Sequence, residues 1–214
     1  MFADRKDAGI QLGARLKAYP LVRTLVLAIP RGGVVVGTAL ARELDAELDV
    51  ILARKLRAPW QPELAIGAIG EDGQMHLGPL AREVPGVTDR YLQDEIKHQL
   101  AEIARRQKLF RNARPAAEIA GRSVILTDDG IATGSTLLAA LHVLRARNPH
   151  ETIVAVPVAP QAMIGRLRGE CDHVECLLAP ADFGAVGAFY RDFEQVEDDE
   201  VVRVLRESRA GAIL

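Results

Sequence analysis

One short segment of the sequence contains a strand, a turn and the start of a helix in immediate succession: Ser123-Val124-Ile125-Leu126-Thr127-Asp128-Asp129-Gly130-Ile131-Ala132-Thr133-Gly134-Ser135-Thr136. Its apolar first part is typical of a strand that is buried on both faces. Gly130 allows the chain to turn, and the small residues after it lead directly into a helical pattern. A buried strand that passes through a tight turn into a helix is the building unit of a parallel α/β sheet.

The same alternation of apolar strands and amphipathic helices extends to both sides of this segment. We therefore predict a Rossmann-like parallel sheet flanked by helices, with right-handed crossovers. Ligands bind such sheets beyond the carboxyl ends of the strands, where residues 30–33, 54–55 and 128–136 are expected to form one site. The predicted strands are 25–29, 48–53, 123–127, 152–156 and 173–178, and the predicted helices are 4–17, 34–44, 89–110, 135–147, 161–168 and 199–209.

The region 56–86 differs from this pattern, because it carries four prolines, five glycines and the only tryptophan. Within it, residues 64–69 and 74–77 flank Gly70-Glu71-Asp72-Gly73, which predicts a β-hairpin. The long charged helix predicted over 89–110 follows.

Composition and charge indicate an ordinary globular protein rather than a nucleic-acid-binding or membrane protein. The chain has 214 residues, 49% of them hydrophobic and 26% charged, as in an ordinary globular domain. A net charge of −2 predicts no general attraction to nucleic acid or to an anionic membrane. No apolar run approaches the roughly 18–20 residues that span a bilayer, and the first residues are charged, so we expect a cytoplasmic protein. Cys171 and Cys176 are interpreted as buried thiols, and the five histidines have no metal-like spacing.

The two acids after the central strand predict contacts with a sugar. Ionised carboxylates only accept hydrogen bonds, which suits the paired hydroxyls of a ribose, and Gly130 lets Asp128 and Asp129 reach one ligand. Backbone N–H groups at the following helix N-terminus, with Thr and Ser hydroxyls, can hold a phosphate. The alternative is a plain turn with Ser135 as a helix cap, but it does not explain why all these residue types follow one buried strand.

The segment 125–136 resembles the phosphoribosyl pyrophosphate signature of the type I phosphoribosyltransferases, and the similarity extends from about Thr24 to Val158. The resemblance implies that Asp128 and Asp129 bind the ribose hydroxyls, that 132–136 bind the 5-phosphate, and that Pro30-Arg31-Gly32-Gly33 bind pyrophosphate. It also implies a pyrophosphate contact by Lys55 and by Arg54; the alternative for these two and for Arg31 is a solvated surface position. The expected catalytic residues are Asp128, Asp129 and Lys55, and the expected substrate contacts are Arg31, Gly32, Gly33, Arg54, Ile131, Ala132, Thr133, Gly134, Ser135 and Thr136, with no protein ligand to a metal.

The family resemblance further implies a single domain, with a flap insertion at about 56–114 and a C-terminal hood at about 157–194. Glu71, Arg105, Arg106 and Arg111 could contribute from the flap, although arginines on a long helix are more often solvated. In the hood, Phe183, Phe189 or Tyr190 could stack on a base or could pack in the core. The implied ligands are phosphoribosyl pyrophosphate, Mg²⁺ bound mainly through the substrate, and a nucleobase-like acceptor; a homodimer is the candidate assembly.

One position departs from part of the family. Hypoxanthine–guanine members carry an acid where this chain has Ala132, so the loop is more similar to adenine- and orotate-type loops. The chain is most similar to an uncharacterised group of predicted phosphoribosyltransferases, through residues 28–33, 128–130 and 190–193. Three functions stay open: a transferase, a sensor that binds without turnover, and a hydrolase or phosphorolytic enzyme acting on a ribosyl phosphate.

Overall fold

The structure is a computed structural model that describes residues 1–78 and 80–210. Its main sheet has five parallel strands in the order β2-β1-β6-β7-β8, which confirms the predicted fold class. The central strand, β6, is the one that leads into the acid pair. The strands are β1 (Leu25–Ala28), β2 (Glu47–Val50), β6 (Ser123–Thr127), β7 (Glu151–Val158) and β8 (His173–Leu178).

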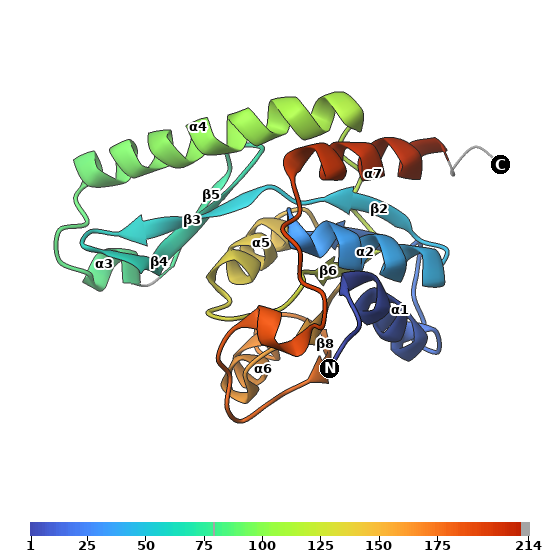
Figure 1. Ribbon diagram of the computed structural model, residues 1–214. Helices are drawn as coiled ribbons and strands as arrows, with labels where there is room; N and C mark the ends of the chain where they lie inside the picture. Colours follow the sequence, from blue (N-terminus) through green and yellow to red (C-terminus); the bar gives the residue numbers. More distant parts are fainter. Residues whose placement is uncertain (79, 211–214) are drawn as a thin grey trace.

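Helices cover both faces of this sheet (Figure 1). Side chains alternate along β6, so Ile125 packs with the helices on one face, whereas Val124 and Leu126 pack with those on the other. The first face carries α1 (Arg5–Leu16), α2 (Gly32–Glu43) and α7 (Asp198–Ala210), and the second carries α5 (Ser135–Arg145) and α6 (Gln161–Leu167).

The strand order places a topological switch point between β1 and β6. The chain moves from β1 outward to β2, and it later returns to the opposite side of β1 as β6. Loops that leave neighbouring strands at such a point diverge and leave room for a ligand between them. The loops after β1 and β6 are the two that the sequence assigns to pyrophosphate and ribose.

A second, three-stranded antiparallel sheet projects beside the main sheet (Figure 1). It contains β3 (Ala53–Ala58), β4 (Gln61–Gly70) and β5 (Met75–Leu77), and the β4–β5 pair confirms the predicted hairpin. The short α3 (Leu80–Glu83) and the long α4 (Asp89–Ala113) follow. The small sheet packs between α4 and α5.

The prediction of one strand over 48–53, ending at Arg54-Lys55, was wrong. The chain leaves the main sheet after Val50 and enters the antiparallel sheet at Ala53, so Arg54 and Lys55 lie inside β3. Ile51 and Leu52, which join the two strands, are both buried. An apolar run without glycine or proline gives no signal of a change of sheet, because both surroundings favour the same residues.

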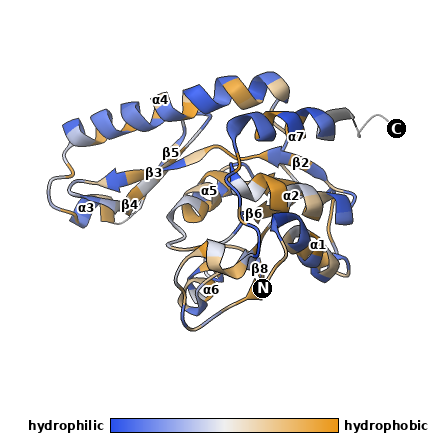
Figure 2. Ribbon diagram, viewed as in Figure 1, coloured by the Kyte–Doolittle hydropathy of each residue, from blue (hydrophilic) through white to orange (hydrophobic). Residues whose placement is uncertain are grey.

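Helix α4 begins at a capping threonine, since the Thr88 side chain accepts a hydrogen bond from the Tyr91 N–H. Figure 2 shows its hydrophilic residues interspersed with fewer hydrophobic ones, and Ile103 and Phe110 are buried. Within the described ranges 1–78 and 80–210, no helix combines the length and the apolar character that crossing a membrane requires.

Candidate functional site

The acid pair lies where β6 ends, and its two carboxylates have different surroundings. Asp128 Oδ1 accepts a hydrogen bond from the Asp129 N–H at 2.8 Å. Burial, and then the neighbouring Asp129 carboxylate, raise the pKa of Asp128 well above its usual range. Asp128 is therefore costly to ionise in the folded protein, as expected of a carboxylate kept for a ligand rather than for an ion pair.

Asp129 is held by a residue that the sequence did not indicate. Arg5, at the start of α1, donates from Nε to Asp129 Oδ2 at 2.8 Å and from Nη1 to the Glu194 carbonyl at 2.7 Å. Its guanidinium also lies over the Phe193 ring, 3.7 Å from the centroid. The Tyr190 hydroxyl donates to the Asp129 carbonyl. Contacts between residues so far apart in sequence leave no local signal, so no pattern could have found Arg5.

The loop after β1 packs directly against the acid pair. A side chain at Gly32 would collide with the Asp129 carboxylate, and a Cβ at Gly33 would lie 2.9 Å from Asp128 Cα. The Pro30–Arg31 peptide bond is cis. Both glycines are thus required for the close approach of the two loops. Arg31 extends from this loop and donates from Nη1 to Glu197 Oε2 at 3.3 Å.

The loop after the acids ends in an open helix N-terminus. Ile131 is buried, and its N–H donates to the Val158 carbonyl. Gly134 has a left-handed φ of 71°, and a Cβ there would lie 2.7 Å from Met163 Sδ. Ala132, Thr133 and Thr136 are exposed, and the Thr133 and Ser135 hydroxyls lie 2.9 Å apart. The loop thus presents hydroxyls and the first N–H groups of α5 to solvent, as a phosphate site requires.

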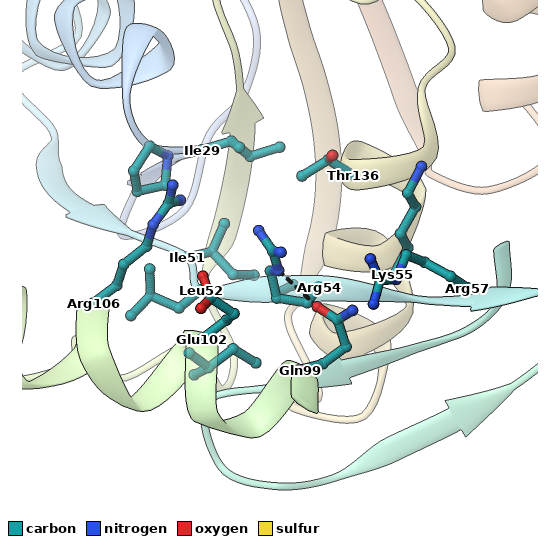
Figure 3. A pocket seen from close by; sticks show the side chains of 13 residues that line it. Ile29, Ile51, Leu52, Arg54, Lys55, Arg57, Gln99, Glu102, Arg106 and Thr136 are labelled. Carbon is teal, nitrogen blue, oxygen red and sulfur yellow. Dashed lines mark hydrogen bonds between the residues drawn. The ribbon is translucent and has the colours of Figure 1, made fainter. Parts of the chain in front are cut away.

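A cavity joins these loops to the second sheet (Figure 3). Pro30 from the β1 loop, Arg54 and Lys55 from β3, and Thr136 from α5 all line it, although Arg54 and Lys55 belong to a different sheet from the one predicted. Asp128 and Asp129 do not line this cavity. The structure therefore brings together at least one residue of each predicted segment, and the Gly32-Gly33 loop packs against the two acids.

Two of the basic residues in this cavity are held in place from α4. Arg54 Nε donates to Gln99 Oε1 at 2.9 Å, and Arg57 makes a two-pronged contact with Glu95. Hydrogen bonds to Glu95 raise the pKa of Arg57. The side chains are thus positioned before any ligand arrives, which lowers the entropy cost of binding.

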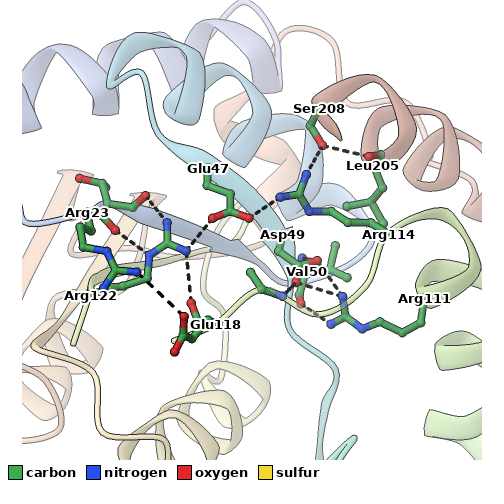
Figure 4. Close-up of polar contacts among 12 residues, drawn as sticks. Arg23, Glu47, Asp49, Val50, Arg111, Arg114, Glu118, Arg122, Leu205 and Ser208 are labelled. Atoms are coloured by element: carbon green, nitrogen blue, oxygen red, sulfur yellow. Dashed lines mark hydrogen bonds and ion pairs between the residues drawn. The ribbon is translucent and has the colours of Figure 1, made fainter. Parts of the chain in front are cut away.

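The flap residues named from the sequence have different roles. The Glu71 carboxylate accepts from Arg111, which also binds the buried Asp49. Figure 4 shows Arg111 directed toward Asp49 and Val50 of β2. Arg105 is exposed beside Asp198, whereas Arg106 lines the cavity.

The aromatic side chains of residues 183–193 pack with one another and with Phe2. Tyr190 is buried, and its ring lies 5.3 Å from Phe2 and 5.0 Å from Phe193. The Phe183 and Phe189 rings are stacked at 5.5 Å. Tyr190 therefore packs in the core, which is the second of the two roles considered for it.

The two cysteines, Cys171 and Cys176, are half-buried free thiols, and burial raises the pKa of each to about 11.

The acid pair offers a metal few ligands of its own. Among residues 1–78 and 80–210, no group of three or more His, Cys, Asp or Glu side chains is arranged to hold an ion. Two neighbouring carboxylates are suitable partners for Mg²⁺ when substrate oxygens and waters supply the rest of its octahedron.

Comparison with known proteins agrees with this geometry. The model of a family described as "Phosphoribosyl transferase domain" matches residues 11–194. Two curated Mycobacterium tuberculosis relatives, "Putative phosphoribosyl transferase Rv0571c" from strain H37Rv and its MT0597 counterpart from strain CDC 1551, are each 43% identical over this whole chain. The chain spans about half the length of these relatives, 49% in each case.

A solved structure, TT1426 from Thermus thermophilus, is 43% identical and superposes with a TM-score of 0.91, covering 96% of this chain and 98% of that one. The family model covers most of the chain, including both loops of the switch point and residues 157–194. The chain therefore belongs to the phosphoribosyltransferase domain family.

Proposed function

We propose that this chain binds Mg²⁺ and phosphoribosyl pyrophosphate and transfers the phosphoribosyl group to a nitrogen of a nucleobase-like acceptor, releasing pyrophosphate. The observation that carries the proposal is the packing of the Gly32-Gly33 loop against Asp128 and Asp129. This contact sets a ribose-binding acid pair beside a loop suited to pyrophosphate, as a substrate that contains both groups requires.

The residues divide the ligand among them. Asp128 and Asp129 bind the ribose hydroxyls, and the loop from Ile131 to Thr136 binds the 5-phosphate. Arg31, Gly32 and Gly33, with Arg54 and Lys55, bind the pyrophosphate. The bond between C1 and the pyrophosphate oxygen breaks, and the oxygen keeps the electron pair. The acceptor nitrogen bonds to C1 and loses its proton to solvent. Bound Mg²⁺ would neutralise charge on the leaving group, and the protein would supply positioning and electrostatic stabilisation.

We also propose that the chain is one domain in which residues 56–114 act as a flap and 157–194 as a hood over the acceptor. A flap that excludes water would protect the activated sugar from hydrolysis. The small sheet and α4 reach the cavity from this side, which supports the assignment.

A sensor without turnover is the second candidate, because no residue of this chain is matched to an acceptor base. Ala132 does not decide between the two functions, since its loop is similar to adenine- and orotate-type loops. The two functions predict the same binding and differ only in pyrophosphate release.

The test combines thermal shift with a pyrophosphate-release assay, using Mg²⁺, phosphoribosyl pyrophosphate and a panel of bases. We expect the ligand to raise Tm, because it binds only the folded state. Asp128→Asn combined with Asp129→Asn should abolish the shift while the circular dichroism spectrum stays native; Asp94→Asn, an exposed acid on α4, is the control. Unchanged binding in the double variant would refute the assignment. Release with one base identifies the acceptor, and binding without release with any base supports the sensor.

A further inference from the structure

One face of α4 forms a wall of the cavity between the two sheets. Gln99, Glu102, Ile103 and Arg106 all line it, at the spacing that places residues on the same side of a helix. This face belongs to the expected flap, far beyond the β1 loop in sequence. Pro30 of the β1 loop lines the same cavity, and Figure 3 shows Arg54 and Arg106 among the side chains around it.

Three arginines near the end of α4, Arg105, Arg106 and Arg111, differ in burial and in their ionic partners. Arg111 is bound to Asp49 and Glu71 inside the protein. Arg105 is exposed and lies 3.5 Å from Asp198. Arg106 is half-buried, and among the residues that the structure describes it has no hydrogen-bond or ion-pair partner. Helix geometry explains the difference, because adjacent residues point about 100° apart.

The surroundings of Arg106 are unfavourable for a cation without a ligand. Burial lowers its pKa, and the charges of Arg54, Arg105 and Arg31 act in the same direction, against a partial offset from Asp198. A half-buried guanidinium beside other cations costs free energy unless an anion neutralises the group. Among the lining residues that the structure describes, Glu102 is the one acid, and the basic residues are Arg54, Lys55, Arg57 and Arg106.

We propose that Arg106 of α4 binds the pyrophosphate group of the activated sugar, so that α4 contacts the leaving group directly. The inference rests on the proposed function and adds a contact from outside the β1 loop. The planar fork of arginine suits two phosphate oxygens at once. Pro30, Arg54 and Thr136 surround the same space, so an anion there would lie next to the loop that holds pyrophosphate.

The consequence is a link between leaving-group binding and flap position. Pyrophosphate held by both the β1 loop and Arg106 would join the main sheet to α4. Ribose 5-phosphate has no group in this position and would not make the contact. The inference therefore predicts that the two ligands respond differently to loss of Arg106.

The experiment compares Arg106→Met with Arg105→Met, the adjacent arginine of the same helix. Calorimetric titrations use Mg²⁺ with pyrophosphate, with phosphoribosyl pyrophosphate and with ribose 5-phosphate. We expect Arg106→Met to raise Kd at least about tenfold for the first two ligands and less than about twofold for ribose 5-phosphate, as for loss of a charge-assisted contact. Arg105→Met should leave all three within about twofold. Arg106→Lys should be intermediate, because it keeps the charge without the fork.

The outcomes separate this inference from the proposed function. If Arg106→Met and Arg106→Lys bind pyrophosphate as tightly as the unmodified protein, or lose ribose 5-phosphate to the same degree, the inference is overturned while the site stands. If the unmodified protein binds none of the three ligands, the proposed function fails and the assignment of Arg106 fails with it. Thermal unfolding of each variant identifies any general loss of structure.

Discussion

Asp128 and Asp129 are neighbours in sequence, but their carboxylates have different interaction partners. Asp129 has a cation, since Arg5 binds its carboxylate. Asp128 has a hydrogen bond from a backbone N–H but no ion pair among the described residues, and both burial and Asp129 oppose its charge. One acid therefore contributes to the fold, and the other is kept at the expense of stability.

This difference predicts that Asp128→Asn stabilises the protein. The raised pKa of Asp128 means that the folded state holds a proton which the unfolded state has lost, so stability falls as pH rises from the usual carboxyl pKa through the raised one. Asparagine removes this cost and can keep the hydrogen bond to the Asp129 N–H. At pH 8 we expect a gain on the order of 1 kcal/mol, or about 2–4 °C in Tm. The gain should shrink as the pH approaches about 4, and ribose 5-phosphate binding should be lost at both pH values.

Asp129→Asn is the matched comparison, and it should act in the opposite direction. It leaves the buried Arg5 without its counter-charge. Losses of about 1–3 kcal/mol are typical when a hydrogen bond to a charged group is removed. Equal Tm values for the two variants at pH 8 would contradict the division of roles between the acids.

At the scale of elements, buried and partly buried ion pairs join the end of α4 to the main sheet (Figure 4). Glu47, at the start of β2, binds both Arg114 and Arg122. Burial alone would raise the pKa of Glu47, but the hydrogen bonds from Arg122 and Arg114 lower it. Arg111 meets Asp49 and Glu71, so three segments of the chain converge on one guanidinium. The wall of the cavity is thus attached through its C-terminal end.

Arg111→Met should weaken this attachment strongly. The Asp49 and Glu71 side chains are only 2% and 8% exposed, and both would lose their cation. Breaking a buried pair by removing one partner costs about 3–5 kcal/mol. Urea unfolding measures the loss, and Lys108→Met, an exposed position of α4, should change stability by less than about 0.5 kcal/mol. A loss below about 1 kcal/mol in Arg111→Met would show that the network is not a structural anchor.

The sequence predicted helices and strands well where the spacing of apolar residues agrees with the positions of turn and capping residues. The strands 123–127 and 173–178 have the predicted bounds, and α1 begins after its Asp4 cap. The boundary between β2 and β3 was missed, because two buried apolar residues connect the sheets without a turn signal. The acid pair and the glycine loop could be placed from their strands, since parallel strands end at one edge. Arg54 and Lys55 still line the cavity, because they lie at the start of β3, close to the point where the chain leaves β2.

At the scale of the whole molecule, the beginning of the chain and the last part of the segment 157–194 meet beside the acid pair. The Phe2 N–H donates to the Phe189 carbonyl, and the Arg191 N–H donates to the Phe2 carbonyl. Phe2 is buried against Tyr190, whose hydroxyl reaches the Asp129 carbonyl. The site motif alone could not reveal this support, because it comes from residues that precede the first strand and follow the last.

Arg5 completes this arrangement, and its loss should affect the ribose end of the ligand only. Its guanidinium fixes Asp129 Oδ2 and leaves Oδ1 for a hydroxyl. In Arg5→Met we expect Kd for ribose 5-phosphate and phosphoribosyl pyrophosphate to rise about tenfold or more, because a charge-assisted hydrogen bond orients the carboxylate. Kd for pyrophosphate should change less than about twofold, the reverse of the pattern expected for Arg106→Met.

Arg15→Met, at an exposed position on the same helix, is the control. Arg5→Lys should keep only part of the affinity, because lysine lacks the planar fork with which arginine contacts Asp129 and Glu194 together. Equal weakening of all three ligands in Arg5→Met would instead mean that Arg5 supports the fold in general and does not position Asp129.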